Sequence, residues 1–433
     1  MFTGTKFSEV AIFRQAVFDS TDFSHVVFNA QVSYNEVIFN GIADFQSGKF
    51  DGGAEFKDVG FMEKADFRDT TFNAVTDFAD STFNGEADFR SVLFKDEVYF
   101  SNPTDYQISN RDSTLEIKVQ GAKFKEECLF SDSTFDGYAH FSPISSLAKT
   151  DFENASFNKG VDFQQADLTD AVFVDARLRN ANFESAQLNR ATLFGADLRG
   201  SLLSGALLGD ARVDDETRFL GPPSANNNGN RSTIWDTLKE LQSKQCCVYD
   251  PKYEGANKSV DIDSAKSVYR ALEELAGRVA RPQLQSKCFV RRQDLQQRQY
   301  WNNVKDADNP LERFISIAKG SRARVARATL LYGESPWRVI AWSLGIIFSF
   351  ALLYPLGEWM KPADSDPITY AQIASNPTEI LDLFYYSTLI YTALGFGDFN
   401  PVGLGRLLTT LETGLGAVML ALLVFILGRR AAR

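Results

Sequence analysis

Aromatic residues recur along the first hundred residues at steps of five and six, a spacing that neither a helix nor a flat strand produces. The tripeptide Ala-Asp-Phe returns at 43–45, 65–67 and 87–89, which sets a period of 22 residues. A fixed period of this length is typical of a solenoid, in which each coil packs only on its neighbours. The expected core positions are Phe2, Phe7, Phe13, Phe18, Phe23, Phe28, Tyr34, Phe39, Phe45, Phe50, Phe56, Phe61, Phe67, Phe72, Phe78, Phe83, Phe89, Phe94 and Phe100.

The pattern lapses over 101–123, where Asn102-Pro103 predicts an inserted loop, and it resumes at Phe124. From Phe163 the spacing tightens to strict fives. A small residue, mostly alanine, stands two places before each large one, so both can point inward while the other three face water. The large inward positions are Leu168, Phe173, Leu178, Phe183, Leu188, Leu193, Leu198, Leu203, Leu208 and Val213.

The motif in these coils is plain in Ala166-Asp167-Leu168, Ala181-Asn182-Phe183 and Ala196-Asp197-Leu198. On this motif the chain resembles the pentapeptide-repeat family. The resemblance implies a four-sided, right-handed β-helix over 1–220, with faces of five and six residues. About nine coils at ~4.8 Å each would make a rod roughly 43 Å long. We expect the rod to be a scaffold or assembly module; an acidic mimic of duplex DNA is the alternative.

Charge is distributed unevenly along the chain. Residues 1–215 carry 19 Lys and Arg against 35 Asp and Glu, a net charge of −16, whereas the remainder carries +5. The acidic part would repel phosphates, so we expect no nucleic-acid partner. The 2 His and 4 Cys show no ligand spacing for zinc, and no nucleophile–base set appears. The sequence therefore predicts no enzymatic activity and no bound cofactor.

A helical linker is predicted over 221–335. It opens with a Gly-, Pro- and Asn-rich loop at 221–230 and continues with helical patches that begin at Ser232, around 268–279 and over 284–301. Asn309-Pro310 is a good cap and first-turn pair for a further helix. We interpret the region as a cytosolic collar, either a plain spacer or the site of an unidentified regulator.

Two apolar stretches near the C-terminus are long enough to cross a bilayer. The 19 uncharged residues 339–357 would cover about 28 Å as a helix, close to one hydrocarbon thickness. The second stretch, 407–428, is interrupted only by Glu412. Basic residues precede the first and follow the second, so the positive-inside rule places both termini in the cytoplasm. The prediction is a multi-pass protein of the cell membrane, in contact with lipid, whose membrane domain is 336–433.

The segment between these stretches holds a short apolar helix that begins at 376–379 and ends near Thr392. Gly395-Phe396-Gly397-Asp398 follows. Non-helical backbone at membrane depth is tolerated only where it is buried or lines a water-filled path. Over about 335–430 the chain resembles the pore domain of two-transmembrane potassium channels, with an outer helix, pore helix, filter and inner helix. The resemblance implies a homotetramer in which filter carbonyls replace the hydration shell of a permeant monovalent cation.

The resemblance places the selectivity filter at Thr392, Ala393, Leu394, Gly395, Phe396, Gly397 and Asp398. It implies ion coordination by the backbone carbonyls of Thr392, Ala393, Leu394, Gly395 and Phe396. Ala393 stands where the family has a threonine, which removes a ring of four hydroxyls from the innermost ion site. Leu394 replaces the usual valine and Phe396 the usual tyrosine. The resemblance therefore implies a cation pore and leaves potassium-selective and non-selective permeation open.

Two further features of the second stretch are singled out. Glu412 lies inside it, and an intramembrane carboxylate is a functional hypothesis by default. We predict that Glu412 sits behind the filter, bonded to the pore helix, and tunes filter stability; a satisfied structural carboxylate is the alternative. The candidate filter-support residues beside it are Tyr385, Tyr386 and Thr388. Gly416, together with Gly414, falls where the inner helix is expected to hinge.

The sequence as a whole predicts a tetrameric, potassium-conducting cation channel whose cytosolic N-terminal part is a β-helix. The alternatives are a non-selective cation pore and a membrane-anchored scaffold with a non-conducting pore. Oligomeric state separates these classes, because one filter strand alone conducts nothing.

Overall fold

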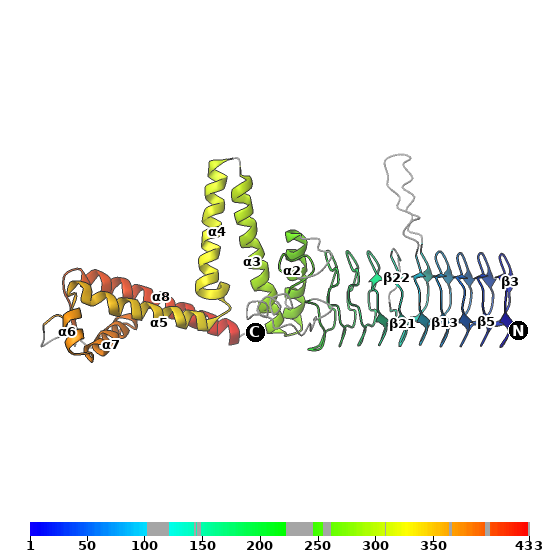
Figure 1. Cartoon of the computed structure of the whole chain (residues 1–433), viewed down its shortest axis with the longest axis horizontal. Coiled ribbons are helices and arrows are strands. Elements are labelled where there is room, and N and C mark those ends of the chain that lie inside the picture. The colour runs from blue at the N-terminus through cyan, green and yellow to red at the C-terminus, as the bar shows by residue number, and fades with distance from the viewer. Residues whose placement is uncertain are drawn as a thin grey trace. The chain divides into compact units, whose positions relative to one another are not determined.

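The computed structural model describes residues 1–101, 121–142, 144, 149–221, 246–253, 261–307, 309–362, 366–394 and 399–431. The chain forms two compact units, Met1–Arg292 and Gln293–Arg433 (Figure 1). The division falls inside α3 (Pro282–Asp306), and therefore inside the linker predicted over 221–335.

The first unit is built from two-residue strands that stack into four parallel sheets. The first sheet contains β1 (Lys6–Phe7), β5 (Val27–Phe28), β9 (Lys49–Phe50), β13 (Thr71–Phe72), β17 (Leu93–Phe94), β21 (Thr134–Phe135) and β23 (Ser156–Phe157). The second contains β2 (Ala11–Ile12), β6 (Val32–Ser33), β10 (Ala54–Glu55), β14 (Thr76–Asp77), β18 (Val98–Tyr99), β22 (Ala139–His140) and β24 (Val161–Asp162).

The remaining two sheets have five strands each. One contains β3 (Val17–Phe18), β7 (Ile38–Phe39), β11 (Gly60–Phe61), β15 (Thr82–Phe83) and β19 (Lys123–Phe124). The other contains β4 (Thr21–Asp22), β8 (Ala43–Asp44), β12 (Ala65–Asp66), β16 (Ala87–Asp88) and β20 (Cys128–Leu129). Four sheets make the four-sided solenoid that the repeat predicts.

The register of the strands follows the sequence period. Ala54 pairs with Thr76, one 22-residue coil later, whereas Val172 pairs with Thr192 after 20 residues, as four strict pentapeptides require. Over 102–120 the predicted insertion lies outside the described residues; Ser101 and Gly121, at its two ends, form an antiparallel bridge. The coils on either side stay in register, because β18 pairs directly with β22.

The interior of the solenoid consists of stacked rings. One ladder runs through Phe23, Phe45, Phe67, Phe89, Phe130, Phe152 and Phe173, with ring centroids 4.9–5.2 Å apart and nearly parallel planes. The small residues two places earlier, such as Ala65 and Ala166, are completely buried. From Phe23 onward the predicted inward positions are buried; the exceptions lie at the two ends of the repeat, where Phe2, Phe7, Phe13, Phe18 and Val213 are only half-buried.

Stacked repeats also bring carboxylates into line. Asp88 is fully buried and accepts from Arg90 Nη2 at 2.6 Å and from Lys64 Nζ at 3.2 Å. Burial raises the pKa of Asp88, but these bonds outweigh it and hold that pKa below its ordinary value. Asp88 therefore stays charged because it pairs with Arg90 in its own coil and with Lys64 in the preceding coil.

A helical cap closes the C-terminal end of the solenoid. Helix α2 (Ile262–Arg278) is capped by Asp261, and Arg278 at its end pairs with Asp210. Behind α2, the fully buried Asp250 accepts from Tyr269 Oη at 2.8 Å and from Arg291 Nη2 at 2.6 Å. Such a cap covers the last coil, whose apolar interior would otherwise meet water. The patch predicted at Ser232 lies outside the described residues; the helix predicted around 268–279 is confirmed by α2.

In its described residues, the second unit contains the rest of α3 and five further α-helices. These are α4 (Pro310–Leu330), α5 (Pro336–Leu353), α6 (Tyr370–Ser375), α7 (Glu379–Tyr391) and α8 (Gly405–Ala431). Short elements join them: the 3-10 turns η2 (Leu331–Gly333) and η3 (Tyr354–Gly357), and the strands β25 (Met360–Pro362) and β26 (Phe399–Pro401). Asn309 caps α4 through Leu311 N at 3.0 Å, with Pro310 in the first turn, as predicted.

Candidate functional site

Two helices of the second unit have the length and composition of membrane spans. They cover Pro336–Gly357 and Gly405–Arg429, close to the stretches predicted from the sequence. Only 22% and 17% of the residues in their most apolar windows are buried within the protein. The core helix of a soluble protein would be mostly buried, so these apolar surfaces favour the membrane interpretation.

Helix α7 packs between these two candidate spans. Its tip is fixed to α5 by a hydrogen bond between Tyr391 Oη and Ser343 Oγ, 2.6 Å apart. Its N-terminal turn carries Glu379 and Asp382, which suit the positive end of the helix dipole. The arrangement of an outer helix, a short inserted helix and an inner helix matches the order predicted from the sequence (Figure 1).

The C-terminal end of α7 makes a defined turn into the predicted filter. Ala393 has a left-handed backbone with φ of 57°; its N–H donates to Ile390 O, and the N–H of Leu394 donates to Leu389 O, both at 3.1 Å. These two hydrogen bonds form a Schellman motif, a helix C-cap that usually has glycine at the left-handed position. The helix therefore stops at Thr392, where the predicted filter starts.

Of the predicted filter, Thr392, Ala393 and Leu394 are described, and residues 395–398 lie outside the described residues. Immediately after them, β26 pairs antiparallel with β25, and Pro362 lies opposite Phe399. Val402 N donates to Trp359 O at 2.9 Å, which extends the pairing of these two segments by one hydrogen bond. The chain that leaves the predicted filter is thus tied to the chain that follows the outer helix.

Glu412 lies at the junction of three helices and is fully buried. Its Oε2 accepts from Tyr354 Oη at 2.6 Å, and its Oε1 is hydrogen-bonded to Ser387 Oγ on α7. Ser387 Oγ also lies 2.9 Å from Ile347 O on α5. One carboxyl group therefore connects α8, α7 and the end of the outer helix, and neither described partner is a cation.

The predicted partners of Glu412 need a correction. The bond to the inserted helix comes from Ser387, and not from a tyrosine or from Thr388. Thr388 Oγ1 instead bonds Phe384 O one turn back, at 2.7 Å. Tyr386 packs edge-on against Tyr354, and Tyr385 against Phe399. Residue spacing could not separate Ser387 from Thr388, because a rotation of 100° about the helix axis distinguishes them.

The two predicted hinge glycines occupy different surroundings. A Cβ at Gly416 would lie 1.9 Å from the carbonyl O of Tyr391, so α8 passes directly against the last residue of α7 and only glycine fits there. A Cβ at Gly414 would meet no atom within 4 Å. Gly416 thus allows the close approach of the two helices, while hinge motion stays a prediction.

The C-terminal end of α8 is bound to the corner before α5. Arg429 Nη2 lies 3.2 Å from Glu334 Oε1, and the Glu334 side chain is almost fully buried. Glu334 follows η2, in which Leu331, Tyr332 and Gly333 all have left-handed φ values of 47°, 57° and 86°. The sequence analysis missed this ion pair, because 95 residues separate its two partners.

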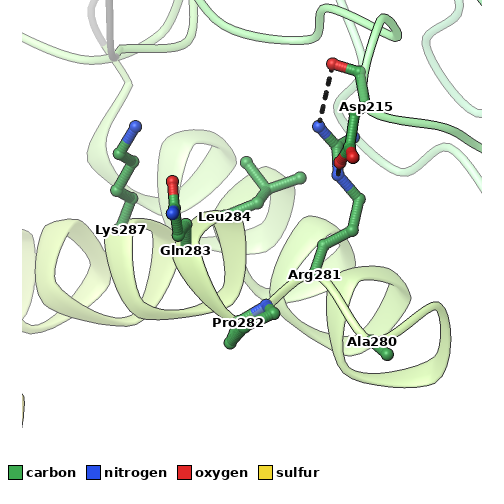
Figure 2. A pocket seen from close by; sticks show the side chains of 7 residues that line it. All are labelled: Asp215, Ala280, Arg281, Pro282, Gln283, Leu284 and Lys287. Carbon is green, nitrogen blue, oxygen red and sulfur yellow. Dashed lines mark hydrogen bonds and ion pairs between the residues drawn. The ribbon is translucent and has the colours of Figure 1, made fainter.

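A separate hollow of about 560 Å³ lies in the first unit where α2 meets α3. Figure 2 shows Arg281 reaching toward Asp215, with Lys287 and the first turn of α3 on the other side. Arg281 Nε lies 3.4 Å from Asp215 Oδ1. This contact joins the start of α3 to the end of the repeat, and none of the predicted pore residues lines the hollow.

Comparison with protein families assigns both parts of the chain. Models of pentapeptide repeats match residues 2–49, 56–103 and 159–193, and a model described as ion channel matches residues 365–433. The chain carries pentapeptide repeats and an ion-channel domain. The solenoid is therefore a pentapeptide-repeat β-helix, and the helical region with two candidate spans holds the channel domain. Both families point to a non-enzymatic protein.

Individual relatives resemble one part of the chain at a time. Protein LctB of Bacillus caldotenax is 27% identical over 109 residues, 25% of this chain and 81% of its own. Protein LctB of Geobacillus stearothermophilus is 26% identical over 91 residues, 21% of this chain and 68% of its own.

Two solved structures are similar to the N-terminal part. HetL, a pentapeptide repeat protein from Nostoc sp. strain PCC 7120, is 15% identical over 49% of this chain and 88% of its own, with a TM-score of 0.19. QnrB1, a plasmid-mediated fluoroquinolone resistance protein, is 15% identical over 48% of this chain and 94% of its own, with a TM-score of 0.22. The family models, and not these low TM-scores, are the basis of the assignment.

Proposed function

We propose that four copies of the chain assemble around an axis into a potassium-conducting channel. Each copy contributes α7 and the segment Thr392–Asp398, whose backbone carbonyls from Thr392 to Phe396 line the ion path. The observation that carries the proposal is the ending of α7. The helix terminates in a Schellman turn at the start of this segment, between two apolar helices, and β25 and β26 close the chain behind it.

Carbonyl coordination suits a monovalent cation that gives up its water. Ordered carbonyls replace the hydration shell, and the C-terminal end of α7 adds negative partial charge. The bonds of Glu412 to Tyr354 and Ser387 hold α7 against α5 and α8 from behind. In this role Glu412 is a positioning residue for the filter, and the buried rings of Tyr386 and Tyr354 fill the space beside it.

A non-selective cation channel is the second candidate, and Ala393 favours it. A methyl group stands where a threonine hydroxyl would line the innermost ion site, so only carbonyls remain there. Ala393 also holds a left-handed φ of 57°, which a β-branched threonine adopts only under strain. Selectivity then depends on the outer sites at Leu394 to Phe396.

The solenoid is proposed to act as an assembly or regulatory module on the cytosolic side of the cell membrane. Basic residues precede the first span and follow the second, and by the positive-inside rule this places both termini in the cytoplasm. The pair between Glu334 and Arg429 joins the corner before α5 to the end of the inner helix. A signal that moves α4 would therefore reach the inner helix through this contact.

The reversal potential of the purified protein in a planar bilayer, with potassium on one side and sodium on the other, tests the proposal. A reversal close to the potassium equilibrium potential is the expected result. A reversal near zero, with cations preferred over anions, would replace it with the non-selective channel.

Native mass spectrometry of the detergent-purified protein separates both from the scaffold alternative. A tetramer of the 48.3 kDa chain is expected. A monomer would contradict both channel proposals, because one copy supplies only one wall of the ion path.

A further inference from the structure

One sheet of the solenoid carries a row of exposed apolar side chains. In the sheet of β3, β7, β11, β15 and β19, Val17 pairs with Ile38, and Ile38 pairs with Gly60. A Cβ at Gly60 would lie 2.9 Å from Met62 Cε and 3.9 Å from Ile38 Cγ1, so Met62 folds over Gly60 beside Ile38. Val17, Ile38 and Met62 are 63%, 39% and 41% exposed. We name these three residues the apolar ladder.

This sheet also differs from the other three in charge. Its first four described strands, β3, β7, β11 and β15, contain no charged residue. The first four strands of every other sheet contain at least two, namely Lys6 and Lys49 in one, Glu55 and Asp77 in the second, and Asp22, Asp44, Asp66 and Asp88 in the third. The apolar ladder therefore lies on the side of these coils where the strands are free of charge, although residues 1–215 carry a net charge of −16.

Acidic solenoids repel one another, and a shared pore forces them together. Four chains around one pore carry four solenoids on the same side of the membrane. Charges are screened only beyond about 8 Å at physiological salt, so two solenoids in contact feel the repulsion. If the sheets that hold Asp22 and Asp44 faced each other, like charges would lie opposite like charges. Two solenoids that meet through the uncharged sheet avoid this opposition.

We propose that the apolar ladder is a contact surface that pairs the solenoids of two subunits within one channel. The proposal rests on the proposed function, because a shared pore is what brings the solenoids together. Each solenoid is joined to its channel domain at the same end, so the paired solenoids run in the same direction. Val17, Ile38 and Met62 then each face their own counterpart, and the four solenoids form two pairs.

The apolar ladder fits a second copy because it is self-complementary. A two-fold contact places the same surface of both subunits face to face, which apolar side chains tolerate and charged side chains do not. Asn40, exposed two residues after Ile38, offers both a donor and an acceptor, so its amide can also bond its own counterpart. Sheets pack face to face about 10 Å apart. Because tethering to one pore raises the local concentration, a small contact is sufficient.

Crosslinking of the full-length protein, in nanodiscs that hold one channel each, tests the proposal. Val17→Cys and Met62→Cys each introduce one accessible thiol into the apolar ladder, and a short bis-maleimide joins two such thiols. Val75→Cys is the matched control, because Val75 is 43% exposed and precedes β14 in another sheet. The four native cysteines are buried, and wild type gives the background. Native mass spectrometry of the same samples reports the tetramer.

Both ladder variants are expected to give at least fivefold more covalent dimer than Val75→Cys. Dilution of the nanodiscs should leave the yield unchanged, because both thiols belong to one channel. Ile38→Asp, added to Met62→Cys, should reduce the yield to that of the control, since it places two carboxylates opposite each other. Ile38 is exposed, so the coil should still fold. Val75→Asp, the matched charge control, should leave the yield of Met62→Cys unchanged.

Three outcomes would count against the pairing. An intact tetramer whose ladder variants crosslink no better than Val75→Cys would overturn the proposal and leave the channel in place. A dimer that forms only between a Val17→Cys chain and a Met62→Cys chain would also overturn it, because such a dimer requires solenoids that run in opposite directions. A monomer in native mass spectrometry would overturn the proposed function and, with it, the pairing.

Discussion

The pentapeptide-repeat solenoid and the channel domain solve opposite problems with the same kinds of side chain. The solenoid turns every phenylalanine of its ladder inward and faces water with a net charge of −16 over residues 1–215. The spans of the channel domain turn leucine and phenylalanine outward and bury a carboxyl group, Glu412, among hydroxyls. The comparison shows that the surroundings, water for the solenoid and lipid for the spans, decide whether apolar or polar side chains are buried.

The two regions also differ in how their contacts relate to the sequence. In the solenoid, residues meet their counterparts 20 to 22 positions away, except across the inserted segment, where the separation is 41, so one local rule generates the core. In the channel domain, single contacts between distant residues hold the helices together. The following substitutions are ordered from the largest expected effect to the smallest, and each tests this contrast.

Gly416→Ala should have the largest effect, namely loss of the assembled tetramer and of the current. The added methyl would lie 1.9 Å from Tyr391 O, a backbone atom that cannot move without displacing α7. Gly414→Ala is the matched control, because its methyl meets no atom within 4 Å in the subunit. Size-exclusion chromatography and bilayer recording measure both. Equal behaviour of the two variants would contradict the close approach of α8 and α7.

Phe67→Ala should destabilise the solenoid by about 3–5 kcal/mol, the usual cost of truncating a buried aromatic residue. Phe67 is fully buried and stacks on Phe45 and Phe89, with centroids 4.9 Å away on both sides. The control is Phe2→Ala at the exposed first coil, where stacking on Phe23 occurs from one side only. Hydrogen exchange of the repeat amides measures the loss; an equal loss in both variants would speak against ladder packing.

Glu412→Leu should cost about 2–3 kcal/mol, because the buried Tyr354 hydroxyl loses its partner and Ser387 keeps only Ile347 O. Glu412→Gln should cost less, since its amide can accept from Tyr354 and donate to Ser387, which then donates to Ile347 O. Thermal stability of the tetramer and single-channel conductance report the two effects. If neither Glu412→Gln nor Glu412→Leu changes the thermal stability or the conductance, Glu412 does not tune the filter.

Asp197→Asn should remove about 2 kcal/mol from the solenoid at neutral pH. Burial raises the pKa of Asp197, but its bonds to Arg199 and Arg179 outweigh burial and lower that pKa to about 2. A lowered carboxyl pKa stabilises the fold above the ordinary value of 3.8 and loses this contribution as pH falls through 2. Unfolding of wild type and variant should therefore converge between pH 4 and about 2. A constant gap over this range would contradict the pairing.

The solenoid could be predicted well from the sequence because the same spacing of large inward residues recurs in every coil. The spacing of phenylalanine places each inward ring, and even the change from 22 to 20 residues per coil follows from the switch to strict pentapeptides. Departures from the pattern lie at the two ends of the repeat: Phe2, Phe7, Phe13 and Phe18 in the first coil and Val213 near the last are only half-buried.

The channel domain was predictable in its order of helices and less so in its contacts. Helix α8 is apolar on all sides, so no stripe in the sequence indicates which side faces α7. Its partners through Glu412, namely Ser387 and Tyr354, depend on that rotation, as does the pairing of Arg429 with Glu334. The left-handed corner at Leu331 and Tyr332 has no signal either, because neither residue type favours that conformation.

The central claim is that cations pass through the segment that follows α7. Thallium influx into liposomes that contain the purified protein tests it most directly, with Gly395→Ala compared against Gly414→Ala. The account predicts influx for wild type and for Gly414→Ala, and none for Gly395→Ala, although its tetramer remains intact. Undiminished influx through an intact Gly395→Ala tetramer would contradict it.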